Sequence, residues 1–431
     1  MNRSGVAYVI GGSIAGLLAT RVLAEHFDRV VLLDRDALPS GPRPRHAVPQ
    51  SRQANMVLSR GVAALEELLP GLTKELVTAG AAVGDVMQDA QWIVDGAVLP
   101  RQPSGLLALV GSHPLVEHTI RARVARMPGV EIVPGSLVDG LLTTADNRRV
   151  TGVRLLAPGG VKELTDAELV VDASGRATLA PRWLTELGYP PPPTVTLRVN
   201  LTYVTRSYRR SGHDIGGRLG TVVLNHPGMP YGGCVLAQGK DRCSLVIAAA
   251  GAAPPVDEND FLAVCRRFAG NTLYDLARYG VALGRPQLMR FPVERWRRFD
   301  QAERYPAGLL PIGDAICSLN PTYGQGVTVA ALQALRLRDL LGRPDGTPFS
   351  ARFLAESAAI IADAWQIAGS LDRQFLGGYE PLSDPIARLR AAASKDPSVA
   401  AAFLRVMQGM QPPQELTEPA LMARVAAALE S

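Results

Sequence analysis

A turn rich in glycine near the start of the chain has the residue types and spacing to bind a pyrophosphate. It follows an apolar run at residues 6–10, and its residues are Gly11, Gly12, Ser13, Ile14, Ala15 and Gly16. Glycine lets the backbone bend sharply, and amides at the start of the helix that follows attract negative charge. The pattern G-x-G-x-x-G is incomplete because Ser13 takes the place of the middle glycine. Serine still offers an amide and a hydroxyl, so we interpret the turn as a variant of this motif.

A carboxylate ends the next apolar run of the chain. Asp34 follows residues 30–33, where its side chain can accept hydrogen bonds from ribose hydroxyls. A carboxylate would also repel a 2′-phosphate, so this position favours FAD or NAD over NADP. Taken alone, both features also have plain structural interpretations: a strand–helix turn without a ligand, and a solvated aspartate at a strand end.

A second glycine-rich segment follows about three hundred residues later. Asp314 comes directly after an apolar run at residues 308–312 and Gly313, in a position to bind a ribityl hydroxyl. The amides of the helix start that follows can stabilise negative charge on a reduced flavin ring; its residues are Pro321, Gly324, Gln325, Gly326 and Val327. An ordinary glycine-rich helix entry is the alternative. A cofactor bound from both ends of the sequence must be long, and FAD fits.

The periodicity of the chain predicts how these motifs are positioned. A strand at 6–10, a helix at 13–26 and a strand at 30–33 form a β-α-β start. We expect further strands at 130–133, 150–155, 169–172 and 308–312, and helices at 53–69, 114–126, 260–269 and 327–341. Between turns after the prolines at 190–193, residues 194–208, 221–225, 233–237 and 243–249 favour an antiparallel sheet.

The predicted fold class is α/β, with a Rossmann-like FAD-binding domain, an inserted antiparallel-sheet substrate domain and C-terminal helices. We expect residues 1–85, 105–185 and 286–345 to form the discontinuous FAD-binding domain, and residues 86–104 and 186–285 to form the substrate domain. Residues 346–431 form a C-terminal helical region in this prediction. A cleft between two domains is a usual place for a ligand.

Composition limits the classes of function. The net charge of +5 comes from scattered arginines without a basic stripe, which suits anionic cofactors better than nucleic acid. The 4 cysteines have no metal-ligand spacing, so we expect reduced thiols and no metal site. The apolar runs are too short for a transmembrane helix, and the start of the chain does not resemble a signal peptide, so we expect a cytoplasmic protein. The oligomeric state stays open.

Together the motifs resemble the class A FAD-dependent monooxygenases of the aromatic hydroxylase type, over about residues 1–345. Segments 45–52 and 171–176 resemble a bacterial subgroup of epoxidases and hydroxylases of polyketide and terpenoid biosynthesis. The resemblance places Arg52, His113 and Asp314 near FAD, with a surface cation and a helix-cap neighbour as the alternatives for the first two. Arg176 is either a surface charge or a structural partner of Asp172. The candidate cofactor-binding set also includes Arg35, Arg45, Asp172 and Ser174.

The resemblance implies that transiently bound NAD(P)H reduces FAD and that O2 then forms a flavin C4a-hydroperoxide. This species would hydroxylate or epoxidise a small hydrophobic organic substrate, such as a polyketide, terpenoid or aromatic intermediate of secondary metabolism or antibiotic biosynthesis. The flavin carries the chemistry, so we assign no catalytic residue. The alternatives are a flavin-dependent isoprenoid reductase and a cyclase or binding protein with structural FAD. A flavin halogenase is disfavoured because the chain lacks a Trp-x-Trp-x-Ile-Pro segment.

Overall fold

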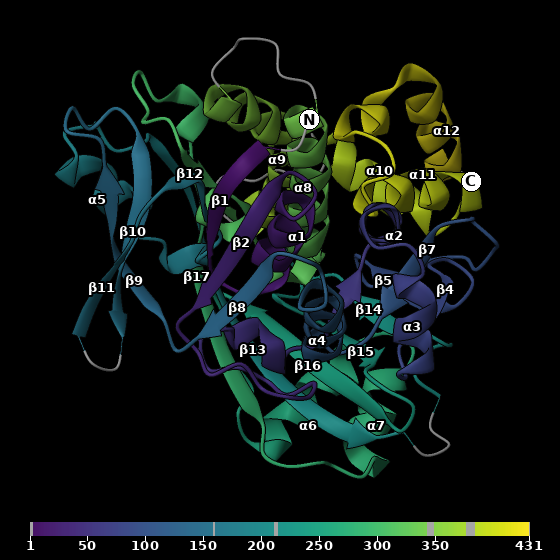
Figure 1. Ribbon diagram of the computed structural model, residues 1–431. Helices are drawn as coiled ribbons and strands as arrows, with labels where there is room; N and C mark the ends of the chain where they lie inside the picture. Colours follow the sequence, from purple (N-terminus) through teal and green to yellow (C-terminus); the bar gives the residue numbers. More distant parts are fainter. Residues whose placement is uncertain (1–2, 158–159, 211–213, 343–348, 376–383, 431) are drawn as a thin grey trace.

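A five-stranded parallel sheet forms the centre of the nucleotide-binding part of the fold (Figure 1). The structure is a computed structural model that describes residues 3–157, 160–210, 214–342, 349–375 and 384–430. In spatial order, the strands of this sheet are β18 (Leu309–Pro311), β12 (Ala167–Asp172), β1 (Arg3–Ile10), β2 (Phe27–Asp34) and β8 (Val130–Pro134). Val9, Leu32 and Val170 are fully buried. Such continuous apolar strands are typical of a sheet that is covered on both faces.

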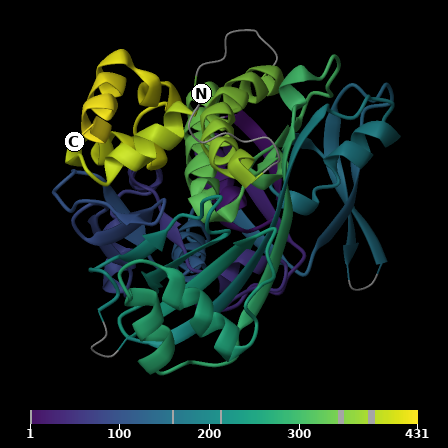
Figure 2. The same cartoon turned by 180° about the vertical axis from the view of Figure 1, so that it is seen from behind.

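Helices from both ends of the sequence pack against this sheet. The glycine turn leads from β1 into α1 (Ile14–Leu23), which packs against α4 (His113–Val124) and α8 (Gln325–Gly342). Helix α9 (Phe349–Asp372) packs against α8 and β18. The downstream segment therefore returns to the same layer that the start of the chain builds (Figures 1 and 2).

An eight-stranded sheet forms the second large unit. Its strands, in spatial order, are β19 (Cys317–Ser318), β17 (Gln287–Arg297), β13 (Thr194–Arg209), β16 (Arg242–Ala250), β15 (Tyr231–Ala237), β14 (Gly220–Val223), β5 (Ala90–Val94) and β6 (Ala97–Val98). Neighbours are antiparallel, apart from β14 and β5, which are parallel. Helices α6 (Glu258–Arg267) and α7 (Thr272–Tyr279) lie below this sheet in Figure 1.

Smaller units complete the molecule. Two three-stranded sheets consist of β9 (Leu137–Thr143), β10 (Val150–Ala157) and β11 (Gly160–Leu164), and of β3 (Met56–Val57), β7 (Leu107–Val110) and β4 (Ala82–Asp85). The remaining α-helices are α2 (Ser59–Leu68), α3 (Leu72–Thr78), α5 (Ala180–Glu186), α10 (Pro385–Ala393), α11 (Pro397–Met407) and α12 (Pro419–Glu430). Figures 1 and 2 both place α10–α12 beside α2, at one side of the molecule.

The predicted fold class is confirmed, but several element boundaries differ from the prediction, and two of these differences lie close to the glycine-rich segments or the cavity. The helix predicted at 53–69 is α2 and begins only at Ser59. The preceding residues form a 3-10 turn at Pro49–Arg52 and the short strand β3, which pairs with β7. The helix predicted from residue 327 begins at Gln325, so Gly326 lies within its first turn. Part of the predicted helical tail, residues 376–383, lies outside the described residues.

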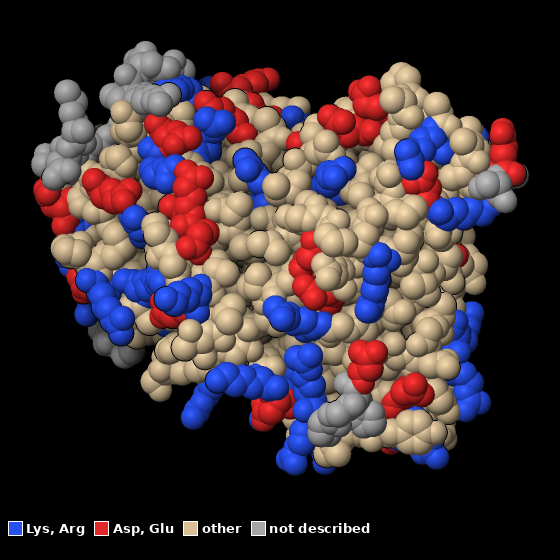
Figure 3. All heavy atoms as spheres, turned by 90° about the vertical axis from the view of Figure 1, so that its right-hand side faces the viewer, with Lys and Arg blue, Asp and Glu red and all other residues tan. Residues whose placement is uncertain are grey.

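The predicted domain ranges stay a prediction. Two strands cross them: β17 and β19 fall in the range given to the FAD-binding domain, yet both belong to the eight-stranded sheet, where β17 pairs with β13 and β19 with β17. None of the helices in the described part of the chain has the length and apolar character needed to cross a bilayer. On the face shown in Figure 3, basic and acidic side chains are interspersed.

Candidate cofactor and substrate site

The glycines of the opening turn are required by close packing. Gly11 has φ of +101°, and a Cβ there would lie 2.5 Å from the carbonyl oxygen of Ala173. A Cβ on Gly16 would lie 1.8 Å from the carbonyl oxygen of Gly11. Ser13 is the N-cap of α1, but its side chain does not cap the helix. Ser13 therefore leaves the first amides of α1 available to another acceptor, as an anion-binding helix start requires.

A buried ion cluster lies beside this turn. Arg45 donates to Asp34 Oδ2 at 2.5 Å and to Glu117 Oε1 at 3.0 Å, and all three side chains are less than 5% exposed. Burial lowers the pKa of Arg45, but the charges of Asp34 and Glu117 outweigh it and hold that pKa above its ordinary value. The Gly12 amide also donates to Asp34 Oδ2, at 2.6 Å. Asp34 Oδ1 accepts from the Asp36 amide at 2.7 Å and keeps a lone pair for another donor, such as a ribose hydroxyl.

The two glycine-rich segments meet at Gly313. This residue has φ of +64°, and a Cβ there would lie 2.8 Å from Cβ of Ala15 in the opening turn. The Gly313 amide donates to Oε1 of the fully buried Gln333 on α8, at 2.8 Å. A Cβ on Gly326 would lie 4.0 Å from Asp314 Oδ1, so this carboxylate lies near the start of α8.

Asp314 has an unusual protonation equilibrium. Burial raises the pKa of its carboxyl to about 6, although the charges of Arg176 and Arg297 lower it. Arg297 donates to the backbone carbonyl of Ala315 at 3.1 Å, which supports the turn that carries Asp314. This carboxyl therefore takes up a proton closer to neutral pH than an ordinary aspartate does, and it is still mostly ionised at pH 7.

Of the remaining predicted residues, some are at least partly buried and others are exposed. His113 lies in the first turn of α4, where burial lowers its pKa and its Nδ1 has no hydrogen-bond partner within the described part of the chain. Val327 is half-buried on α8. Three residues are exposed. Arg35 directly follows β2, Arg52 ends the 3-10 turn before Gln53, and Pro321 lies in the loop before α8.

Asp172 closes its own turn. Its Oδ1 accepts from the Ser174 amide at 2.9 Å and the Ser174 hydroxyl at 2.5 Å, and its Oδ2 accepts from Thr178. Arg176 points elsewhere: it donates to the Val293 carbonyl at 3.0 Å and stacks on Phe291 at 4.3 Å. The alternative that makes Arg176 a structural partner of Asp172 therefore finds no support in these contacts. Local serine and threonine hydroxyls satisfy this carboxylate instead.

These groups fit a long flavin nucleotide. The uncapped start of α1 suits its phosphates, and the free lone pair of Asp34 suits its ribose. Asp314 and the start of α8 suit the ribityl chain and the ring, and the unpartnered nitrogen of His113 adds a hydrogen-bonding group at the start of α4. Within the described residues, no group of three His, Cys, Asp or Glu side chains is arranged for a metal ion.

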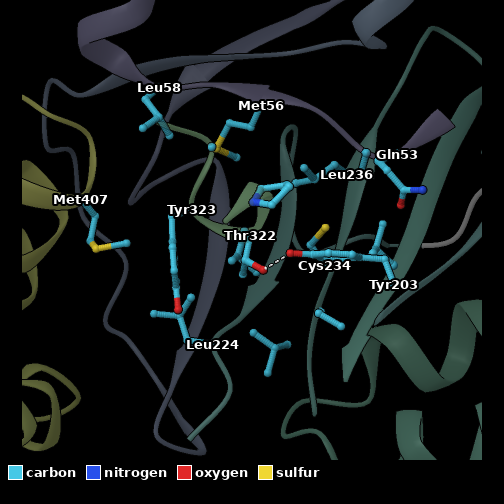
Figure 4. Close-up of a pocket in the computed structure, with 18 of the residues that line it drawn as sticks. Gln53, Met56, Leu58, Tyr203, Leu224, Cys234, Leu236, Thr322, Tyr323 and Met407 are labelled. Carbon is cyan, nitrogen blue, oxygen red and sulfur yellow. Dashed lines mark hydrogen bonds between the residues drawn. The ribbon is translucent and has the colours of Figure 1, made fainter. Parts of the chain in front are cut away.

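An apolar cavity lies beside the loop that precedes α8 (Figure 4). Its walls come from the eight-stranded sheet, from the loop, from the segment before α2 and from the end of α11. The lining residues are Gln53, Ala54, Met56, Leu58, Trp92, Tyr203, Val222, Val223, Leu224, Gly233, Cys234, Leu236, Val246, Ala248, Met289, Pro321, Thr322, Tyr323, Gly324, Met407 and Gln408. No charged side chain is among these described residues, so the cavity suits an uncharged molecule.

A buried hydrogen-bond network fixes the loop against the sheet. The Tyr203 hydroxyl donates to Asn320 Oδ1 at 2.7 Å and lies 2.8 Å from Thr322 Oγ1 (Figure 4). Asn320 Nδ2 donates to Asp372 at 2.9 Å, and the Tyr323 hydroxyl donates to Asp372 Oδ1 at 2.6 Å. Burial raises the pKa of Asp372 to about 6. The loop is thus bound on one side by β13 and on the other by α9.

A second buried carboxyl supports the same loop. Glu294 on β17 is fully buried, and its Oε1 accepts from the Asn320 amide at 2.6 Å. Its Oε2 has no partner within the described part of the chain. Burial, with a smaller contribution from the charge of Asp372, raises the pKa of Glu294 to about 8. The group is therefore mostly protonated at neutral pH.

Sequence reasoning missed several residues of this site. Glu117 lies on α4, far from the opening turn in sequence, and Asp372 lies near the end of α9. Met407 and Gln408 come from the C-terminal region, whose role the sequence did not indicate. None of them belongs to a short motif, so only the folded chain brings them together.

Comparisons with known proteins agree with this geometry. The chain is 32% identical to Protein Rv3254 of Mycobacterium tuberculosis over 414 residues, which cover 88% of this chain and 87% of that protein. It is 27% identical to a kynurenine 3-monooxygenase of Salinispora arenicola over 416 residues, 90% of this chain and 82% of that protein. No protein-family model matches.

A solved structure shows the same fold. It is that of pqsL, described as a probable FAD-dependent monooxygenase from Pseudomonas aeruginosa, with a TM-score of 0.65 and 18% identity. The similarity covers 87% of this chain and 99% of that one. The chain therefore belongs to the same family as Protein Rv3254, and it has the fold of a probable FAD-dependent monooxygenase.

Proposed function

We propose that this enzyme binds FAD between its two glycine-rich segments and uses NAD(P)H and O2 to hydroxylate or epoxidise a small hydrophobic molecule. A polyketide, terpenoid or aromatic intermediate of secondary metabolism is the substrate class that we favour. One observation carries the proposal: the turn at Gly313 touches the opening turn at Ala15, and the same downstream loop borders an apolar cavity.

The chain's own groups have distinct roles in this proposal. The first amides of α1 bind the phosphates. Asp34 binds the ribose through Oδ1, because Arg45 binds Oδ2. Asp314 binds the ribityl chain, and the start of α8 faces the ring. When bound, FAD would supply the redox and oxygen-transfer chemistry.

The cavity excludes water and orients the substrate. Its apolar lining favours an uncharged molecule and keeps the reacting region dry, which suppresses wasteful side reactions. The network of Tyr203, Asn320 and Asp372 keeps the loop between cavity and cofactor in one position. We assign no acid or base to these residues, which position the loop.

An absorption spectrum and turnover assays test the proposal. Purified protein should show the bands of an oxidised flavin, and the extracted cofactor should be FAD. With a hydrophobic substrate, the enzyme should consume NADH or NADPH and O2 in equal amounts and transfer one oxygen atom from 18O2 to the product. A chain that binds no FAD overturns the proposal.

The same assays separate the alternatives. Reduction of a substrate double bond without O2 identifies an isoprenoid reductase. Turnover that needs neither O2 nor NAD(P)H identifies a cyclase with structural FAD. A halogenated product formed only with added halide identifies a halogenase.

A further inference from the structure

The excess positive charge of the chain belongs to the part that builds most of the eight-stranded sheet. Residues 194–293, from β13 to the first part of β17, hold 12 basic and 6 acidic residues. The rest of the chain holds 33 basic and 34 acidic residues, so it carries almost no net charge. Such a charge asymmetry attracts the basic part of a protein to polyanions, which include nucleic acids, acidic proteins and anionic lipid surfaces.

One segment of this part is basic without any acidic residue. Residues 276–293 contain no aspartate or glutamate. Of the two acids that flank the segment, Asp275 is exposed on α7, and Glu294 is fully buried on β17. The exposed arginines of the segment are Arg278, Arg285 and Arg290. The segment therefore presents positive charge to the surroundings of the molecule.

The same segment exposes large apolar side chains. Tyr279, Val281 and Leu288 are 65%, 52% and 50% exposed, although they lie within ten residues of one another. Covering such side chains is favourable, and their grouping marks a surface that contacts another apolar phase. Arginine together with tyrosine and aliphatic side chains is typical of surfaces that enter the interface of a bilayer, where tyrosine lies at the level of the headgroups.

The fold places this segment along one edge of the eight-stranded sheet. The Val281 carbonyl accepts from the Arg209 amide of β13 at 2.8 Å, and β17 pairs Leu288 with Val204 of the same strand. Strand β19 covers the other end of β17. In Figures 1 and 2, α7 and the chain between it and β17 lie at the lower margin of the molecule. A flat surface can therefore approach the segment.

We propose that residues 278–290 dock this protein reversibly onto an anionic lipid surface. The arginines bind the phosphates of the headgroups, and the exposed apolar side chains enter the interfacial layer. A nucleic acid backbone offers charge but no apolar layer, so exposed valine and leucine favour lipid. Met289, from the same strand, lines the cavity, so docking brings the cavity wall close to a phase that dissolves hydrophobic substrates. This last consequence alone rests on the proposed function.

Vesicle sedimentation of the unchanged full chain tests the proposal without any variant. Vesicles of phosphatidylcholine alone are compared with vesicles that also contain phosphatidylglycerol, in the absence of NAD(P)H and substrate. We expect binding to the anionic vesicles only. That binding should decline steeply with added NaCl, because salt screens the charge of the headgroups. Absence of binding to the anionic vesicles, or equal binding to both kinds, overturns the proposal.

Two variants at exposed positions locate the contact. Arg285→Gln should weaken binding to the anionic vesicles about fivefold, the effect of one arginine near a lipid surface. Leu288→Ser should weaken it about three- to tenfold, because it removes an apolar group from the interface. The matched controls are Arg148→Gln and Val161→Ser, which change exposed side chains near and on the small β9–β11 sheet. Equal weakening by the variants and their controls contradicts the proposal.

Polyglutamate in place of vesicles tests an acidic protein as the partner. It carries charge without an apolar layer, so it should bind more weakly than the anionic vesicles. Polyglutamate binding as tight as vesicle binding, with both insensitive to Leu288→Ser, assigns the surface to an acidic partner and refutes lipid docking. These assays need no turnover, so failure of the proposed function would appear separately, as missing FAD or O2-independent turnover, and would leave vesicle binding unaffected.

Discussion

The hydroxyl of Ser13 donates a hydrogen bond to Oε2 of Glu117 at 2.8 Å. The serine that replaces the middle glycine of the motif thus ties the opening turn to α4, and Glu117 is held in turn by Arg45. Ser13→Gly restores the ordinary motif and removes this contact. We expect it to lower the free energy of unfolding by about 1 kcal/mol and to weaken FAD binding. Urea unfolding and FAD titration of the stripped protein measure both.

Ser13→Thr is the control for this contact because it keeps a hydroxyl at the same position. Its FAD affinity should stay close to that of the unchanged protein. Tighter FAD binding by Ser13→Gly would show that the hydroxyl is not part of the cofactor site.

Arg45→Met should be strongly destabilising. It leaves the buried carboxylates of Asp34 and Glu117 without their shared cation. In comparable buried pairs, the loss of one partner lowers the free energy of unfolding by about 3 to 5 kcal/mol. Arg29→Met is the control, because Arg29 and Glu131 form a pair that is 55% and 52% exposed. Arg29→Met should lower the free energy of unfolding by less than about 1 kcal/mol. Similar losses for both variants in urea unfolding would contradict a buried role for Arg45.

Gly313→Ala should disturb the contact between the two glycine-rich segments. The residue has φ of +64°, and its new Cβ would lie 2.8 Å from Cβ of Ala15. The left-handed backbone alone costs about 1 kcal/mol for alanine, and the overlap adds to it. We expect a lower Tm and a lower FAD content after purification.

Gly342→Ala provides the comparison for that variant, because nothing lies within 4 Å of a Cβ at this helical position. Its Tm and FAD content should match or exceed those of the unchanged protein. Normal FAD content in Gly313→Ala would show that the contact with Ala15 does not shape the cofactor site.

Glu294→Gln should become more stable than the unchanged protein as the pH rises. Burial raises the pKa of Glu294 from 4.5 to about 8, so the folded state binds this proton more tightly than the unfolded state does. The stability of the unchanged protein therefore falls between pH 4.5 and about 8, whereas glutamine does not titrate. The difference in Tm should grow across this window and level off above it.

The exposed Glu163 on β11 provides the control for this pH series. The Tm difference between Glu163→Gln and the unchanged protein should show no comparable growth with pH. A constant Tm difference for Glu294→Gln would mean that Glu294 is ionised throughout the range.

The sequence predicted those parts of the fold that local patterns determine. Continuous apolar runs before Gly11 and Gly313 identified two strands of one parallel sheet, β1 and β18, which are separated by β12, because buried strands have this pattern. The start of α2 was misplaced because residues 53–58 are held by distant partners. Thr205 binds the side chain of Gln53, and β7 pairs with Met56–Val57.

The substrate side of the site was much less predictable. Asp372 and Gln408 have no helical or strand periodicity that distinguishes them from ordinary polar residues. Their roles depend on contacts with Asn320 and Ser59, which are remote in sequence and set by how helices pack. Local spacing carries no information about such contacts.

The position of Gln408 has a consequence for biosynthesis. The cavity needs Gln53 from the beginning of the chain and Gln408 from near its end, so a ribosome must release almost the whole polypeptide before the wall closes. A nascent chain can form the parallel sheet earlier, but the apolar face of its eight-stranded sheet then stays open instead of lining a closed cavity. Chaperones that shield apolar surfaces during translation would therefore matter most in the interval before α11 emerges.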